Sequence, residues 1–165
     1  MSTSPSDRLP LSTRRVRTAA VLPLRTSVLR PTFPPGTFAT YDRDETAGTV
    51  HVAAFDGADV VGVATVYAEA PPDALRGAIP AWAYAPGAAW QLRGMATSAA
   101  ARGTGAGAAA LAETLAAVCD GGGRAAWCNA RRVAVGFYAR QGWTAVGDEF
   151  DIAGIGPHVV MWRAL

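Results

Sequence analysis

The segment from residue 91 to residue 118 decides the fold. It begins Gln-Leu-Arg-Gly-Met-Ala-Thr-Ser-Ala-Ala-Ala, continues Arg-Gly-Thr-Gly-Ala-Gly over residues 102–107, and ends in an alanine-rich run. In that run Leu111, Leu115 and Val118 recur at helical spacing. This order predicts a strand, a glycine turn and a helix. Glycines lack Cβ atoms, so backbone N–H groups lie bare at the positive end of the helix dipole, which suits a phosphate or pyrophosphate.

Spacing separates three nucleotide-binding motifs that place glycines before a helix. A Walker A loop needs a lysine, and the chain contains none. The dinucleotide fingerprint can be aligned with Gly105, Gly107 and Ala110, but the expected strand at 125–129 lacks the acidic residue that this motif needs. The pattern Q/R-x-x-G-x-G/A is met at every fixed position by residues 102–107. An ordinary glycine-rich turn before a core helix stays as the alternative.

Length and composition indicate one globular domain. The chain has 165 residues, half of them apolar, and a formal net charge of +2. Six of its arginines fall within the first thirty residues without interleaved aromatics, which favours a solvated segment over a nucleic-acid arm. We expect a disordered tail over residues 1–13 and a single domain over residues 14–165.

The sequence predicts a cytoplasmic protein with neither a membrane nor a nucleic acid as partner. It has no apolar run long enough to cross a membrane and no signal-peptide pattern. Cys119 and Cys128 are not in a C-x-x-C arrangement, and we expect both to be reduced. With only His51 and His158 besides, local spacing assembles no metal site.

Strands and helices alternate in the middle of the chain and strands pair at its ends, which indicates a mixed α/β sheet. The connection over 71–87 carries Trp82 and Tyr84, which either line a pocket or cover the sheet edge. The expected helices are one that carries Val21, Leu24, Val28 and Leu29, one after the glycine turn, and one over residues 131–141. Expected strands cover residues 14–18, 49–55, 60–69, 88–98, 124–129, 143–152 and 158–165.

At residues 102–107 the sequence resembles the GNAT superfamily of acyl-CoA-dependent N-acetyltransferases. Residues 150–161 and the stretch from Tyr41 to His51 resemble its ElaA-like branch. The resemblance covers nearly the whole chain after about residue 14. It implies the GNAT fold, a mixed, mostly antiparallel sheet flanked by helices, with a splayed central strand pair. It also implies that residues 25–45 shape the acceptor side of the cleft.

The resemblance implies acetyl-CoA (coenzyme A) as the cofactor. The glycine loop would hold the pyrophosphate through backbone amides, and the strand before it would bond the pantetheine, with the Met95 amide polarising the thioester carbonyl. Asn129 lies two places from the family's usual asparagine position, which Arg131 occupies here. The cofactor-binding residues that the resemblance implies are Met95, Ala96, Thr97, Arg102, Gly103, Thr104, Gly105, Ala106, Gly107, Asn129, Arg131 and Tyr138.

The resemblance also suggests catalytic residues. Residues 134–143 resemble the family's A-x-x-x-Y-x-x-x-G-F motif, in which the tyrosine, here Tyr138, gives a proton to the departing thiolate. Core packing is the alternative for this aromatic residue. His158 is the first candidate for the general base, and Glu149, Asp151 and His51 follow it. A chain of water molecules without a dedicated base also stays open.

These residues predict an N-acetyltransferase that moves an acetyl group directly from acetyl-CoA to a primary amine of a small molecule or peptide. Two alternatives remain: an acyl-enzyme on Cys128, and a non-catalytic acyl-CoA-binding or sensing module of the same fold. The sequence leaves open the acceptor, the base and the oligomeric state, with a homodimer as one option. Five carboxylates could attract a cationic amine if they converge: Asp42, Asp44, Glu45, Glu149 and Asp151.

Overall fold

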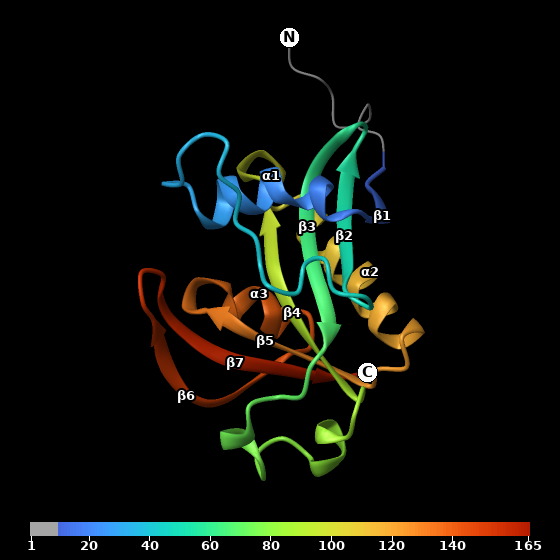
Figure 1. Ribbon diagram of the computed structural model, residues 1–165, viewed down its shortest axis with the longest axis vertical. Helices are drawn as coiled ribbons and strands as arrows, with labels where there is room; N and C mark the ends of the chain where they lie inside the picture. Colours follow the sequence, from blue (N-terminus) through green and yellow to red (C-terminus); the bar gives the residue numbers. More distant parts are fainter. Residues whose placement is uncertain (1–9) are drawn as a thin grey trace. The chain divides into compact units, whose positions relative to one another are not determined.

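The computed structural model describes residues 10–165, and its strands form one mixed sheet with helices beside it (Figure 1). The strand order is β1-β2-β3-β4-β5-β7-β6. The strands are β1 (Ser12–Val16), β2 (Val50–Asp56), β3 (Asp59–Ala68), β4 (Ala89–Thr97), β5 (Ala125–Arg131), β6 (Thr144–Ile152) and β7 (Gly156–Ala164). The α-helices are α1 (Thr18–Leu29), α2 (Ala106–Asp120) and α3 (Val135–Arg140); short 3-10 helices are η2 (Asp73–Leu75), η3 (Ala81–Tyr84), η4 (Ala99–Ala101) and η5 (Arg132–Ala134). The predicted mixed α/β sheet is confirmed.

The chain divides into two compact units. The first comprises the residues up to Thr65 together with Gly94–Thr114, and the second comprises Val66–Arg93 with Leu115–Leu165. Strand β4 and helix α2 each contribute to both units. The predicted single domain over residues 14–165 stays a prediction.

In the first unit, α1 packs its predicted apolar stripe against the sheet. Strand β1 pairs antiparallel with β2, from Ser12 opposite Phe55 to Val16 opposite His51. Val21 of α1 is fully buried in a cluster with β-strand residues, and the other three stripe residues, Leu24, Val28 and Leu29, pack against this cluster. Burial of this face stabilises a helix whose sequence has no helix-capping side chain.

In the second unit, β5 pairs antiparallel with β7, and β7 pairs antiparallel with β6; these strands are orange to red in Figure 1. The parallel pair is β4 with β5, whose register joins Ala89–Gln91 to Ala125–Trp127. Among the described residues this register ends at Gln91, although both strands continue. The predicted splay of the central strands stays a prediction.

The connection over residues 71–87 folds back on the second unit. Trp82 and Tyr84 pack on a buried apolar cluster that contains Trp127. The Trp82 ring lies 6.4 Å from the Trp162 ring, and the Tyr84 hydroxyl donates to the Pro72 carbonyl at 3.1 Å. Both aromatic residues therefore cover the strands with part of their surface.

Two predicted elements have the wrong bounds. Strand β1 begins at Ser12 because the β2 register includes Ser12 and Thr13, whereas Thr18, the expected strand end, begins α1. Residues 1–9 of the predicted tail lie outside the described residues. The helix expected over 131–141 begins only at Val135, because pairing with β7 extends β5 to Arg131, opposite His158.

Candidate functional site

The predicted pyrophosphate loop, residues 102–107, lies in the first unit, where residues 102–105 form an exposed turn and Ala106 and Gly107 begin α2. Gly103 and Gly105 have φ of 76° and 88°, a backbone conformation that side chains disfavour. A Cβ built on either glycine would meet no described atom within 4 Å. Helix α2 begins at Ala106, and its first amides have no acceptor within the helix. Open space thus lies beside donors at a positive helix end, and this arrangement fits a diphosphate.

The strand before this loop carries an irregularity. Gly94, in the middle of β4, has φ of 59°, a left-handed value that interrupts regular strand geometry as in a β-bulge. Ala96 is buried in the apolar cluster below α1, whereas Met95 and Thr97 are half-buried. The backbone of residues 95–97, predicted to bond the pantetheine, therefore follows directly on a glycine kink.

Tyr138 of α3 lies in the second unit and is 7% exposed. Its ring packs on Trp143 at 5.2 Å and on Phe137 at 5.3 Å between ring centroids. Burial holds the pKa of Tyr138 well above its ordinary value, and the neighbouring Cys128, to which it is hydrogen-bonded, raises the pKa further. The phenol therefore keeps its proton at neutral pH, as a proton donor must, and the same raised pKa makes it a weaker acid than an ordinary tyrosine.

Cys128 of β5 is a buried thiol beside Tyr138. Burial raises its pKa to about 12, although hydrogen bonds with Tyr138 and the Met161 backbone act in the opposite direction. Because the thiolate is the nucleophilic form, this thiol is poorly suited to carry an acyl group. The geometry disfavours the acyl-enzyme alternative.

We predict that one thiol of the folded protein reacts with Ellman's reagent at about pH 8 and that both react in denaturant. Cys119 is exposed, whereas Cys128 is buried with a raised pKa. Absorbance of the released thionitrobenzoate measures the count. The Cys119→Ser variant is the control and should lose the fast native reaction. A fast second thiol in folded Cys119→Ser protein would contradict the burial of Cys128.

His158 of β7 has an imidazole arranged to accept a proton. Its Nδ1 lies 2.7 Å from the Gly156 carbonyl oxygen, which can only accept, so Nδ1 carries the hydrogen. The lone pair is then on Nε2. The ring stacks on Phe150, with 6.0 Å between centroids, and the residue is 4% exposed. In this tautomer Nε2 is the ring nitrogen that can accept a proton.

Glu149 of β6 is bound to a surface arginine. Arg132 Nε donates to Glu149 Oε2 at 2.9 Å, and Arg132 Nη2 donates to Oε1. The hydrogen bond from Arg132, followed by its positive charge, lowers the pKa of Glu149. A carboxylate with a lowered pKa is a weaker base, so the geometry favours His158 over Glu149.

The remaining predicted residues divide between the two units. The first unit contains residues 95–97 and the loop. The second contains Tyr138, Glu149 and His158, together with Asn129 and Arg131 on β5, where Asn129 faces Val160 and Arg131 faces His158 in the strand register. Of the five carboxylates expected to attract a cationic amine, Asp44 and Glu149 are paired with arginines and thus largely neutralised.

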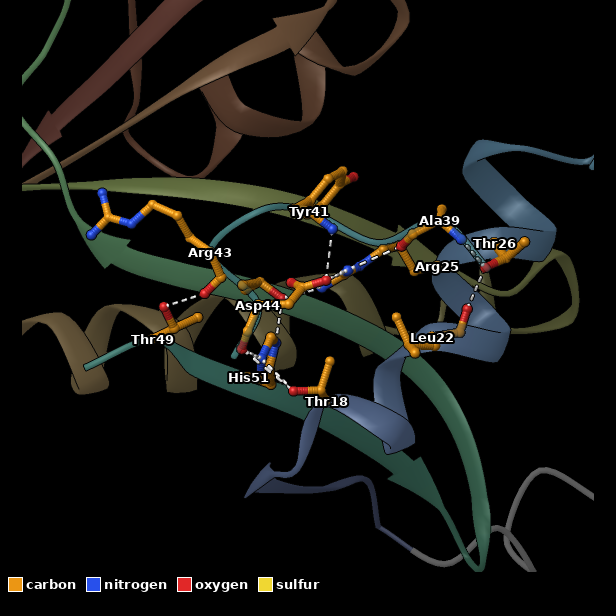
Figure 2. Close-up of polar contacts among 11 residues, drawn as sticks. Thr18, Leu22, Arg25, Thr26, Ala39, Tyr41, Arg43, Asp44, Thr49 and His51 are labelled. Atoms are coloured by element: carbon orange, nitrogen blue, oxygen red, sulfur yellow. Dashed lines mark hydrogen bonds and ion pairs between the residues drawn. The ribbon is translucent and has the colours of Figure 1, made fainter. Parts of the chain in front are cut away.

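Sequence reasoning missed a buried polar network in the first unit. Figure 2 shows Arg25 of α1 pointing toward Asp44, with His51 and Thr18 beside that aspartate. Arg25 is completely buried, and Asp44 and His51 are 6% and 4% exposed. His51 is hydrogen-bonded inside this network, which places it in the core and disfavours it as a base. The available signal was an arginine four residues after Val21, on the apolar stripe of α1.

Within residues 10–165, no helix is long and apolar enough to cross a membrane. Residues 10–165 also bring together no group of three or more His, Cys, Asp and Glu side chains that could hold a metal ion.

Comparison with known proteins gives concordant matches. A family model described as acetyltransferase (GNAT) domain matches residues 38–163. The uncharacterized N-acetyltransferase YitI of Bacillus subtilis is 32% identical over 125 residues, which is 76% of this chain and 77% of YitI.

Solved structures match over nearly the whole chain. Escherichia coli ElaA has a TM-score of 0.66 at 18% identity and covers 93% of this chain and 99% of its own. An acyl-CoA N-acyltransferase from Pseudomonas aeruginosa has a TM-score of 0.60 at 21% identity and covers 94% of this chain and 100% of its own. At these identities the structures show the shared fold.

Proposed function

The chain belongs to the GNAT acetyltransferase family, and we propose that it moves an acetyl group directly from acetyl-CoA to a primary amine of a small molecule or peptide. Family membership supports an acyltransferase and the use of an acyl-CoA. Acetyl as the acyl group, and an amine of either kind as the acceptor, are the proposal. The predicted cytoplasmic location stays a prediction.

The observation that carries the proposal is the open glycine loop before α2. Gly103 and Gly105 leave free space where any other residue would place a Cβ, and the first amides of α2 are donors without helical acceptors. Arg102 stands at the head of this loop as an exposed cation. These groups would bind the diphosphate of the cofactor, and the backbone of residues 95–97 would orient its pantetheine arm.

Bound acetyl-CoA supplies an activated thioester. We assign to Tyr138 the proton that the thiolate needs on departure, because Tyr138 stands at the tyrosine position of the family's A-x-x-x-Y-x-x-x-G-F motif and its phenol stays protonated. We assign to His158 the removal of a proton from the amine, because its Nδ1–H bond to Gly156 leaves a lone pair on Nε2. Direct transfer agrees with a Cys128 thiol that stays protonated.

Initial-rate kinetics test the reaction. We predict that a panel of polyamines, amino-acid amides and peptides with free N-termini contains an acceptor whose acetylated product is detected by mass spectrometry. N-acetylated versions of the same compounds are the control and should not react. Varying both substrates should give intersecting double-reciprocal lines.

Two other outcomes of these measurements would contradict the proposed reaction. Parallel lines would favour the acyl-enzyme route and contradict direct transfer. Saturable acetyl-CoA binding with no amine acetylated across the panel would favour the non-catalytic binding module.

A further inference from the structure

The side of Gly94 where a side chain would stand is occupied by Arg25. A Cβ built on Gly94 would lie 2.7 Å from Arg25 Nε and 3.0 Å from Tyr41 Cε2. Gly94 also has φ of 59°, so this position excludes a side chain for two independent reasons. The guanidinium of α1 thus touches the backbone of β4 one residue before the predicted pantetheine-binding stretch.

Arg25 is fixed in this place by bonds to three residues in two segments, the connection between α1 and β2 and strand β3. Its Nη1 donates to Asp44 Oδ2 at 2.7 Å and to the Ala39 carbonyl at 3.1 Å. Its Nη2 donates to Asp44 Oδ1 at 3.1 Å and to Thr65 Oγ1 at 2.6 Å. Two parallel bonds to one carboxylate fix the plane of the guanidinium, which a lysine could not reproduce.

His51 and Tyr41 complete the support (Figure 2). Asp44 Oδ2 accepts the Tyr41 amide at 2.8 Å, and the Arg25 guanidinium carbon lies 4.4 Å above the Tyr41 ring. His51 Nε2 lies 2.9 Å from the Asp44 carbonyl, so it carries the hydrogen. His51 Nδ1 then accepts from Thr65 at 2.7 Å, while the same hydroxyl accepts from Arg25. With a neutral His51, each of these hydrogen bonds has one donor and one acceptor.

One buried donor remains. Arg25 Nε has no hydrogen-bond partner among the described residues and is the arginine atom nearest to Gly94. Burying an ion pair with an unsatisfied donor costs desolvation free energy, which apolar residues of similar volume would not cost. We therefore expect the network to fix the backbone conformation at Gly94, in addition to any contribution to stability.

We propose that Arg25 is a positioning residue, which supports the kink at Gly94 and thereby holds the backbone of residues 95–97 in the conformation that the acyl-CoA site requires. This inference rests on the proposed function. Loss of Arg25 would let β4 relax at Gly94, while the glycine loop, which binds the diphosphate, would stay intact. The predicted effect is a lower kcat with nearly unchanged cofactor affinity.

The test uses the Arg25→Met/Asp44→Asn double variant, because removing Arg25 alone would leave Asp44 buried and uncompensated. We expect kcat to fall by roughly 30-fold, the scale of a small misplacement of reacting groups, with the Kd for acetyl-CoA within about threefold of wild type. Amide hydrogen exchange over residues 94–97 should accelerate at least about tenfold, with no change at residues 102–107.

Two further variants keep the test decisive. Arg25→Lys retains the charge next to Asp44 and should fold, yet it should show the same pattern because it loses both the two parallel bonds to Asp44 and the Nε group beside Gly94. Arg15→Met removes the surface pair of Arg15 with Glu113 in the same unit and should leave all three readouts unchanged. Unchanged exchange over 94–97 in either folded Arg25 variant would overturn the inference, as would a loss of affinity in proportion to kcat.

These results separate the two proposals. If the wild type neither binds acetyl-CoA nor acetylates an amine, the proposed function fails. Hydrogen exchange over residues 94–97 still decides whether Arg25 holds β4, because that measurement needs no substrate.

Discussion

Tyr138→Phe is expected to lower kcat by roughly 100-fold, which is the lower end of what a general acid contributes. The phenylalanine keeps the ring that packs on Trp143 at 5.2 Å, so only the hydroxyl is lost. Losing its hydrogen bond to Cys128 should cost about 1 kcal/mol of stability. Steady-state kinetics with acetyl-CoA varied should show an unchanged KM, since the hydroxyl takes no part in binding the diphosphate.

The pH dependence follows from the same residue. Because the pKa of Tyr138 is raised well above its ordinary value, the acid stays protonated across neutral and mildly alkaline pH. We therefore expect no loss of kcat from ionisation of Tyr138 below about pH 10, the ordinary tyrosine value. Tyr67→Phe is the matched control, because it removes another buried tyrosine hydroxyl, bonded to Gln91 at 3.0 Å. If Tyr138→Phe keeps wild-type kcat, the residue serves core packing alone.

Gly105→Glu is expected to weaken acetyl-CoA binding by at least about 100-fold, or nearly 3 kcal/mol. The new side chain would enter the open space beside the loop and place a carboxylate in the proposed diphosphate site. A residue other than glycine at φ of 88° also costs about 1–2 kcal/mol of stability. Calorimetric titration measures the affinity, and thermal unfolding shows whether the variant is folded.

The chain offers a matched control for this variant. Gly48 has φ of 89°, is exposed, and likewise would place a Cβ within 4 Å of no described atom. Gly48→Glu should therefore cost the same stability and leave acetyl-CoA affinity at the wild-type value. If both variants lost the same affinity, the cause would be backbone strain or the added negative charge anywhere on the protein, and the loop would have no specific role.

The sequence predicted those elements whose signals are local. The glycine turn at 102–107 and the helix after it follow from glycine spacing and from leucines at helical intervals, and the structure places α2 at Ala106. The hairpin between β2 and β3 follows from β-branched runs around Asp56-Gly57. In each case the residues that specify the element lie within it or next to it.

The errors involve partners that are distant along the chain. Arg131 extends β5 because β7 lies beside it, and nothing near Arg131 indicates that pairing. Arg25 is buried because Asp44 and Thr65, 19 and 40 residues further along, satisfy its guanidinium. An arginine on the apolar stripe of α1 indicates a buried cation, but a single sequence does not identify its partners, so the contacts between Arg25 and Gly94 are visible only in the structure.

Calorimetric titration of acetyl-CoA into the wild-type protein tests the central claim most directly. We predict saturable binding of one acetyl-CoA per chain, with competition by free coenzyme A, because we assign the diphosphate that both share to the glycine loop before α2. A folded protein that shows no binding heat and no thermal stabilisation by acetyl-CoA would contradict the account. The loop at residues 102–107 would then be an ordinary turn before a core helix.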